Sequence, residues 1–127
     1  HFKRINDDRG HQAGDLVLAA AAAAFGKVSR PSDRLYRYGG DEFVAMIPGE
    51  DARDTLRVVE RMVAAASEIR FDAPHEDIQI SCSAGVVSPD ASLSIFESAQ
   101  VLELADRALY HAKRMGRNCA VAYSDSM

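Results

Sequence analysis

Two adjacent carboxylates, Asp41 and Glu42, directly follow two glycines and carry the clearest chemistry in the sequence. Neighbouring carboxylates repel each other, so a tight turn that holds both is destabilised unless a cation offsets the charge. The glycines, Gly39 and Gly40, have no side chains and let a phosphate approach the backbone closely. The pattern predicts a turn that binds a metal ion and a phosphate. The alternative is an ordinary turn, because aspartate and glycine are common there.

A second polar group, Lys3, Asn6, His11 and Asp15, leads into the first expected helix. Asparagine and aspartate together can hydrogen-bond a guanine edge, because the carboxylate accepts from the ring N–H and the exocyclic amine. The alternative places Asp15 in the first helical turn, where a negative charge suits the helix dipole, and Asn6 and His11 in an ordinary loop. The spacing alone leaves both interpretations open.

A third group, Lys113 and Arg117, closes the last expected helix. Two cations four residues apart could clamp a phosphate. Cations at a helix C-terminus are also favoured by the dipole, so a purely structural role stays open.

The composition is that of one folded domain. The chain has 127 residues, 47% hydrophobic and 27% charged, which argues against disorder. A net charge of −4 excludes a broad basic surface for duplex nucleic acid, although not a small phosphate pocket. Cys82 and Cys119 lack metal-ligand spacing and are expected to be reduced thiols of a cytoplasmic protein. No apolar run reaches the ~18 residues that a bilayer span needs.

The elements that must position these residues are both helices and strands. Apolar residues at spacings of three and four predict helices over residues 14–28, 52–69 and 95–115. Strand-like runs over 35–38 and 43–47 flank the glycine pair and predict a hairpin, in which glycine would supply positive φ. Strands are also expected over 78–87, where Gly85 indicates a bulge or a close backbone approach, and over 119–123. Together they predict an α+β fold with helices around a mainly antiparallel sheet.

Five ordered blocks of the sequence resemble the GGDEF domain family, the diguanylate cyclases. They are FKxxND from residue 2, GHxxGD from residue 10, RYGGDEF from residue 37, SAGV from residue 83 and ADxALYxAKxxGRN from residue 105. The resemblance runs over residues 2–121 and implies a palm-like nucleotidyl-cyclase fold. It also implies an enzyme that condenses two GTP into cyclic di-GMP with release of two pyrophosphates. Each domain of that family binds one GTP, so the resemblance implies a homodimer for catalysis.

The family pattern assigns nucleotide contacts to five residues. Asn6 and Asp15 would read the guanine, and His11 would lie beside the nucleotide. Gly39 and Gly40 would let the substrate approach the turn.

The same pattern assigns the phosphoryl chemistry to charged residues. Asp41 and Glu42 would hold Mg²⁺ or Mn²⁺, with Asp41 as the candidate base for the attacking 3′-hydroxyl. Lys3 would neutralise charge in the transition state, and Lys113 with Arg117 would hold the outer phosphates. Phosphoryl transfer is mostly in-line positioning and charge neutralisation, which these residue types can supply.

The resemblance also implies an inhibitory site for the product at Arg30 and Asp33, with Arg61 as its secondary arginine. A guanidinium can grip phosphate and stack on guanine, while the carboxylate accepts from the guanine edge. The alternative is a surface turn with a solvated charge.

The sequence departs from the family pattern in one place. The family has a further metal-binding aspartate on a first strand, three positions before the residue that matches His1, and this sequence starts after that position. We therefore interpret residues 1–127 as a single, N-terminally incomplete GGDEF domain, the C-terminal part of a longer sensory protein whose membrane anchorage stays open. Two other functions remain: a catalytically silent receptor for cyclic di-GMP, and a regulatory GTP-binding domain attached to a phosphodiesterase.

Overall fold

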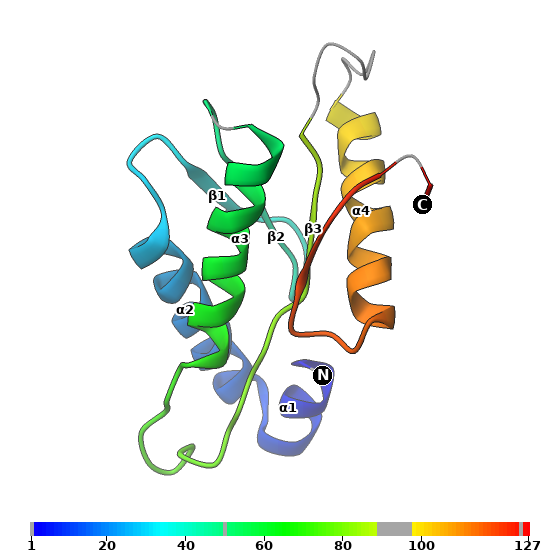
Figure 1. Ribbon diagram of the computed structural model, residues 1–127. Helices are drawn as coiled ribbons and strands as arrows, with labels where there is room; N and C mark the ends of the chain where they lie inside the picture. Colours follow the sequence, from blue (N-terminus) through cyan, green and yellow to red (C-terminus); the bar gives the residue numbers. More distant parts are fainter. Residues whose placement is uncertain (1, 50, 89–97, 125) are drawn as a thin grey trace.

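The structure, a computed structural model, describes residues 2–49, 51–88, 98–124 and 126–127 (Figure 1). Helices and short strands are interspersed along it. The elements are α1 (Phe2–Arg9), α2 (His11–Val28), β1 (Arg34–Arg37), β2 (Phe43–Met46), α3 (Ala52–Ser67), β3 (Ala84–Val86), α4 (Ser98–Arg114) and β4 (Ala120–Ala122). None of the helices in these ranges combines the length and apolar character that a membrane crossing needs.

Two consecutive helices form the N-terminal part of the described chain, so the ordinary loop considered for Asn6 is wrong. Helix α1 contains Asn6, and α2 begins three residues earlier than expected. Gly10 joins the helices with a φ of 90°, in the left-handed region that glycine adopts without steric cost. Only Phe2 and Ile5 of α1 pack against the core, which is why its sequence lacks an apolar stripe. An ion pair between Arg9 and Asp77 ties the end of α1 to the loop that leads towards β3.

The hairpin expected around the glycine pair is confirmed. Strands β1 and β2 pair antiparallel, with Arg37 opposite Phe43. The backbone N–H groups of Tyr38 and Gly39 donate to the Glu42 carbonyl at 2.8 and 3.3 Å. The positive φ expected for the glycine pair is wrong, because among the described glycines only those at positions 10, 49 and 116 have it. A two-residue turn would require such angles, whereas this longer connection closes without them.

A second sheet joins β3 and β4 in parallel, with Ala84 opposite Ala120. The described strands thus form two separate two-stranded sheets, where a single, mainly antiparallel sheet was expected. The strand expected over 78–87 is shorter because a strand needs a hydrogen-bonding partner, and β4 offers three residues. The close backbone approach expected at Gly85 is confirmed: a Cβ there would overlap the carbonyl oxygen of Ala105 and the amide nitrogen of Leu109 in α4.

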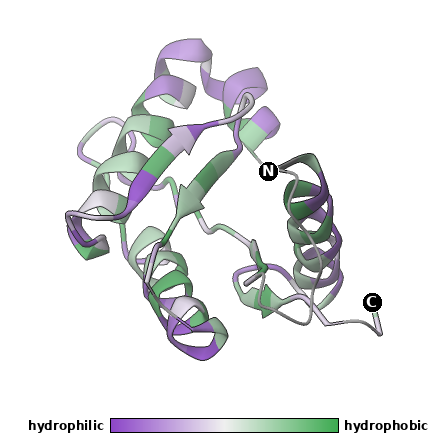
Figure 2. Cartoon of the chain, turned by 90° about the horizontal axis from the view of Figure 1, so that it is seen from above, coloured by the Kyte–Doolittle hydropathy of each residue, from purple (hydrophilic) through white to green (hydrophobic). Residues whose placement is uncertain are grey.

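The core that positions the hairpin lies between α2 and α3. Phe25 and Met62 are buried there, and Leu35 and Phe43 pack against them from the two hairpin strands. The rings of Phe25 and Phe43 meet edge to face with centroids 5.6 Å apart. Figure 2 shows the hydropathy of the two hairpin strands. Strand β2 is hydrophobic along its whole length, whereas β1 contains both hydrophilic and hydrophobic residues. The hairpin is therefore held over α2 by the apolar side chains of one face.

Candidate functional site

A cleft of about 530 Å³ lies along part of the boundary between α2 and the hairpin. Small and apolar side chains make up most of its lining. The lining residues are Asp15, Leu18, Ala19 and Ala22 of α2 and Leu35, Arg37 and Phe43 of the hairpin. The cleft is open to solvent over much of its surface, so a ligand there would stay partly exposed. Here the polar groups are one carboxylate and one guanidinium, contributed by different elements.

The polar side of α2 brings Asp15 to the cleft. His11 lies four residues earlier and therefore about one turn away on the same face of the helix. Both side chains are exposed. The two predicted nucleotide contacts on α2 thus share one face.

Asn6 reaches the same region from α1. It is half-buried, and it lies against α2 so closely that a Cβ on Gly14 would overlap its Oδ1 atom. Gly14 immediately precedes Asp15, so Asn6 lies against the turn of α2 that carries Asp15. Lys3 is exposed on α1, three residues before Asn6.

The turn that carries the two carboxylates is braced by Arg37, a residue to which the sequence analysis assigned no role. Its Nε donates to the Gly39 carbonyl at 3.2 Å and its Nη2 to the Gly40 carbonyl at 2.7 Å. Glu42 packs against Gly39, where a Cβ would lie 3.3 Å from Glu42 Oε2. Because Arg37 also lines the cleft, it connects the cleft to the turn. An arginine two residues before a glycine pair was the signal that could have identified it.

Asp41 and Glu42 present an open pair of oxygen donors. Both side chains are exposed, and no group of three or more His, Cys, Asp or Glu side chains among the described residues could hold a metal ion. Mg²⁺ is commonly held by one or two carboxylates, with water and substrate phosphates completing its shell. The two carboxylates at this turn fit that kind of site.

Lys113 and Arg117 lie at the C-terminal end of α4, far along the sequence from the other candidate residues. Gly116, Arg117 and Asn118 have φ values of 107°, 63° and 51°, a left-handed run that terminates the helix. The Asn118 N–H donates to Ser83 Oγ at 3.2 Å, which fixes this end against the segment before β3. Both cations are exposed, and within the described residues no hydrogen bond or ion pair joins them to the cleft.

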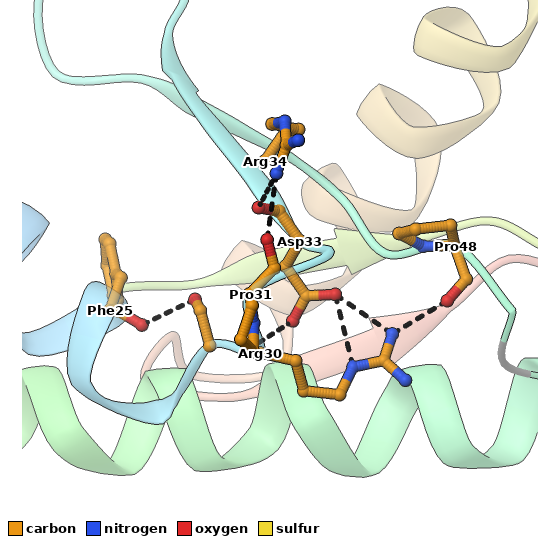
Figure 3. Close-up of polar contacts among 7 residues, drawn as sticks. Phe25, Arg30, Pro31, Asp33, Arg34 and Pro48 are labelled. Carbon is orange, nitrogen blue, oxygen red and sulfur yellow. Dashed lines mark hydrogen bonds and ion pairs between the residues drawn. The ribbon is translucent and has the colours of Figure 1, made fainter.

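Arg30 and Asp33 form the turn between α2 and β1 (Figure 3). The Asp33 side chain is 2% exposed, and its carboxylate accepts from the Arg30 backbone N–H at 2.8 Å and from Arg30 Nη2 at 2.9 Å. Arg30 Nη2 also donates to the Pro48 carbonyl at 2.8 Å, just beyond β2. The side-chain hydrogen bond from Arg30 holds the pKa of Asp33 below its usual range. The third predicted member, Arg61, is exposed on α3.

Residues 1–119 match the family model described as diguanylate cyclase, GGDEF domain. Among curated proteins, the chain is 42% identical over 118 residues to diguanylate cyclase DgcP of Pseudomonas aeruginosa, covering 93% of this chain and 17% of that protein. It is 38% identical over 122 residues to diguanylate cyclase DosC of Escherichia coli K12, covering 92% of this chain and 25% of that protein. The chain therefore spans a quarter or less of these two relatives.

Solved structures show the same fold. The active GGEEF domain of a diguanylate cyclase from Vibrio cholerae superposes with a TM-score of 0.88 at 31% identity, over 98% of this chain and 78% of that one. The GGDEF domain of DgcB from Caulobacter crescentus, in complex with c-di-GMP, gives 0.85 at 34% identity, over 96% and 71%. The expected α+β class is confirmed by these matches.

Proposed function

The chain belongs to the GGDEF domain family of diguanylate cyclases, and we propose that it is the part of a longer sensory protein that condenses two GTP into cyclic di-GMP. One observation carries the proposal. The cleft between α2 and the hairpin has Asp15 on one wall and, on the other, Arg37, which braces the turn bearing Asp41 and Glu42. In this proposal guanine binds at the Asp15 side of the cleft and the phosphates bind at the Arg37 side.

The guanine is read by Asn6 and Asp15. The Asp15 carboxylate accepts from the ring N–H and the exocyclic amine, while the Asn6 carboxamide offers a donor and an acceptor to the rest of the edge. His11 lies beside the nucleotide. A site built on such hydrogen bonds rejects adenine because its polar groups would be left unpaired.

The phosphates lie towards the hairpin turn, whose glycines, Gly39 and Gly40, leave the backbone accessible. Asp41 and Glu42 would hold Mg²⁺ or Mn²⁺, which would supply charge neutralisation at the phosphates. Lys3 adds positive charge at the reacting phosphate. Lys113 and Arg117 hold the outer phosphates.

The reaction joins two nucleotides and each domain binds one, so two copies meet face to face. Each 3′-oxygen bonds to the α-phosphorus of the other nucleotide, and the bond from that phosphorus to pyrophosphate breaks. A carboxylate oxygen of Asp41 takes the proton of the 3′-hydroxyl. Holding the two reacting groups in line is worth several orders of magnitude in rate.

The metal site and the sheet are completed by residues that precede His1. We propose a further metal-binding aspartate three positions before His1, on a strand that belongs to a palm-like sheet. Residues 1–127 alone should then make product far more slowly than the intact protein.

The product binds at Arg30 and Asp33, with Arg61 contributing, and restrains the enzyme. In support, the related domain of DgcB was solved in complex with c-di-GMP. Inhibition requires that the product favours a non-productive arrangement over the productive one, beyond binding alone.

The function is tested by incubating the intact protein with GTP and Mg²⁺ and detecting the product by chromatography. Glu42→Ala should reduce turnover by about two orders of magnitude or more without unfolding the protein, because its side chain is exposed. Glu60→Ala, an exposed carboxylate on α3, is the matched control and should leave turnover unchanged. Full activity of Glu42→Ala would contradict the proposal. Binding of GTP or cyclic di-GMP without turnover would favour the regulatory or receptor alternatives.

A further inference from the structure

The corner between α1 and α2 contains a contact that only glycine permits. Gly14 is buried, and a Cβ built on it would overlap Asn6 Oδ1 and lie 2.8 Å from Asn6 Cγ. The same Cβ would lie 3.2 Å from Cζ of Phe2. Carbon atoms in ordinary van der Waals contact are about 3.5–4.0 Å apart. The space beside Gly14 is therefore occupied by the Asn6 carboxamide.

Backbone conformation does not explain this glycine. Gly14 lies inside α2 and does not have a positive φ, so an alanine would adopt its backbone angles without strain. Glycine inside a helix is less favourable than alanine, because glycine loses more backbone freedom when the chain folds. Helix α2 thus has a helix-destabilising residue at the position where a side chain would displace Asn6.

A second glycine in the same helix provides the contrast. Gly26 has no atom within 4 Å of a built Cβ. Both glycines weaken the helix by propensity, but only Gly14 has a neighbour that depends on the missing side chain.

We propose that Gly14 is a positioning residue, whose missing side chain lets the Asn6 carboxamide lie against the turn of α2 that carries Asp15 and so sets the geometry with which guanine is read. The inference rests on the proposed function, since it concerns the base-reading pair of that site. Within the described residues the Asn6 carboxamide makes no hydrogen bond, so packing rather than a bonded partner determines where it lies.

Alanine at position 14 would act on recognition more than on folding. The overlapping atom is the end of a short side chain that can rotate away, so the fold tolerates the change. The rotation moves the donor and the acceptor by on the order of an ångström, and hydrogen bonds weaken steeply when distance and angle are lost. Because the base is remote from the reacting phosphates, the loss falls mainly on GTP binding and on base selectivity.

The test compares three variants of the intact protein: Gly14→Ala, Asn6→Ala and the control Gly26→Ala. Binding of non-hydrolysable GTP and ATP analogues is measured by calorimetry, and stability by thermal unfolding. Gly14→Ala should weaken GTP-analogue binding about tenfold or more, as Asn6→Ala should, and bring the GTP-to-ATP preference towards one. Its KM for GTP should rise more than its kcat falls. Gly26→Ala should raise the unfolding temperature and leave binding unchanged.

The double variant Gly14→Ala, Asn6→Ala separates packing from recognition. It should bind the GTP analogue as weakly as Asn6→Ala alone, because the carboxamide whose position Gly14 sets is already absent. If Gly14→Ala alone failed to fold, the double variant should fold, since the overlap with the carboxamide is gone. A double variant that also failed to fold would place the conflict elsewhere and overturn the inference.

Failure of the inference and failure of the function are distinguishable. Gly14→Ala with normal affinity and selectivity, alongside an impaired Asn6→Ala, would overturn the positioning role and leave the site assignment standing. An Asn6→Ala variant with normal GTP-analogue binding would instead overturn the assignment of guanine reading itself.

Discussion

Arg30 donates to both carboxylate oxygens of Asp33, through its backbone N–H and its guanidinium. The carboxylate is almost fully enclosed, and the arginine also reaches the Pro48 carbonyl beyond β2. The pair therefore has a structural role with no ligand bound. The role proposed for product binding is additional to it, so the two must be measured separately.

The ion pair gives a pH-dependent contribution to stability. Arg30 lowers the pKa of Asp33 from its ordinary value of 3.8, so the stabilisation is fully present above about that pH and is lost as pH falls through the lower folded value. Arg30→Ala should therefore differ most from the unsubstituted protein in free energy of unfolding near neutral pH, and less below pH ~4. The measurement is urea unfolding across a pH series.

Arg34→Ala is the matched control for this pair. Arg34 donates to the carbonyls of Pro31 and Asp33, which do not titrate. Its effect on stability should stay constant over the same pH range, and an Arg30→Ala effect equally constant would contradict the assignment.

Product binding at this turn should depend on the same two residues. Because Arg30 is already bonded to Asp33 and Pro48, a ligand phosphate must exchange some of these contacts for its own. Calorimetry should show cyclic di-GMP binding that Arg30→Ala abolishes, and the variant should be relieved of product inhibition in turnover assays. Binding that persists in the Arg30→Ala, Asp33→Ala double variant would place the product elsewhere.

Arg37→Ala should impair catalysis more than folding. The side chain is exposed, so its removal changes little buried area, but the carbonyls of Gly39 and Gly40 lose their donor. The turn would then no longer hold Asp41 and Glu42 in one arrangement, and kcat should fall about tenfold or more. Arg107→Ala, which removes an exposed i,i+4 ion pair with Glu103, is the control and should leave kcat unchanged. Equal kcat in both variants would show that the brace is dispensable.

Gly85→Ala should destabilise the domain strongly. The added methyl would overlap backbone atoms of α4, which cannot rotate away as a side chain can. We expect at least the roughly 1–3 kcal/mol typical of overpacking, measured as a lower urea midpoint. Gly40→Ala, where nothing lies within 4 Å of a built Cβ, should leave the midpoint nearly unchanged. A midpoint for Gly85→Ala close to that of the unsubstituted protein would mean that α4 can move away from β3.

The sequence predicted the elements whose signal is local. Helices α2 and α3 and the hairpin followed from apolar periodicity and from the glycine pair, and the close approach at Gly85 followed from a glycine inside a strand. Helix α1 was missed because only Phe2 and Ile5 of its residues face the core. The strand predicted over 78–87 was too long, because the length of β3 depends on pairing with β4, which is far away in the sequence.

The sequence predicted which residues make up the candidate site, but not how they are arranged in space. Nothing in the spacing indicated that Asp15 and Arg37 would line the same cleft, because that depends on the packing of Phe43 against Phe25. The enclosure of Asp33 was equally invisible, since a short polar turn usually lies in water. Both are consequences of tertiary packing.

An arginine fastens each end of the hairpin: Arg30 at the open end, through Pro48, and Arg37 at the turn. Each guanidinium serves two acceptors at once through its rigid planar fork, which a lysine ammonium on a flexible stem does not reproduce. During evolutionary drift, these two positions should therefore resist exchange for lysine even though charge would be conserved. The strand residues between them, exposed on one side, should vary far more freely.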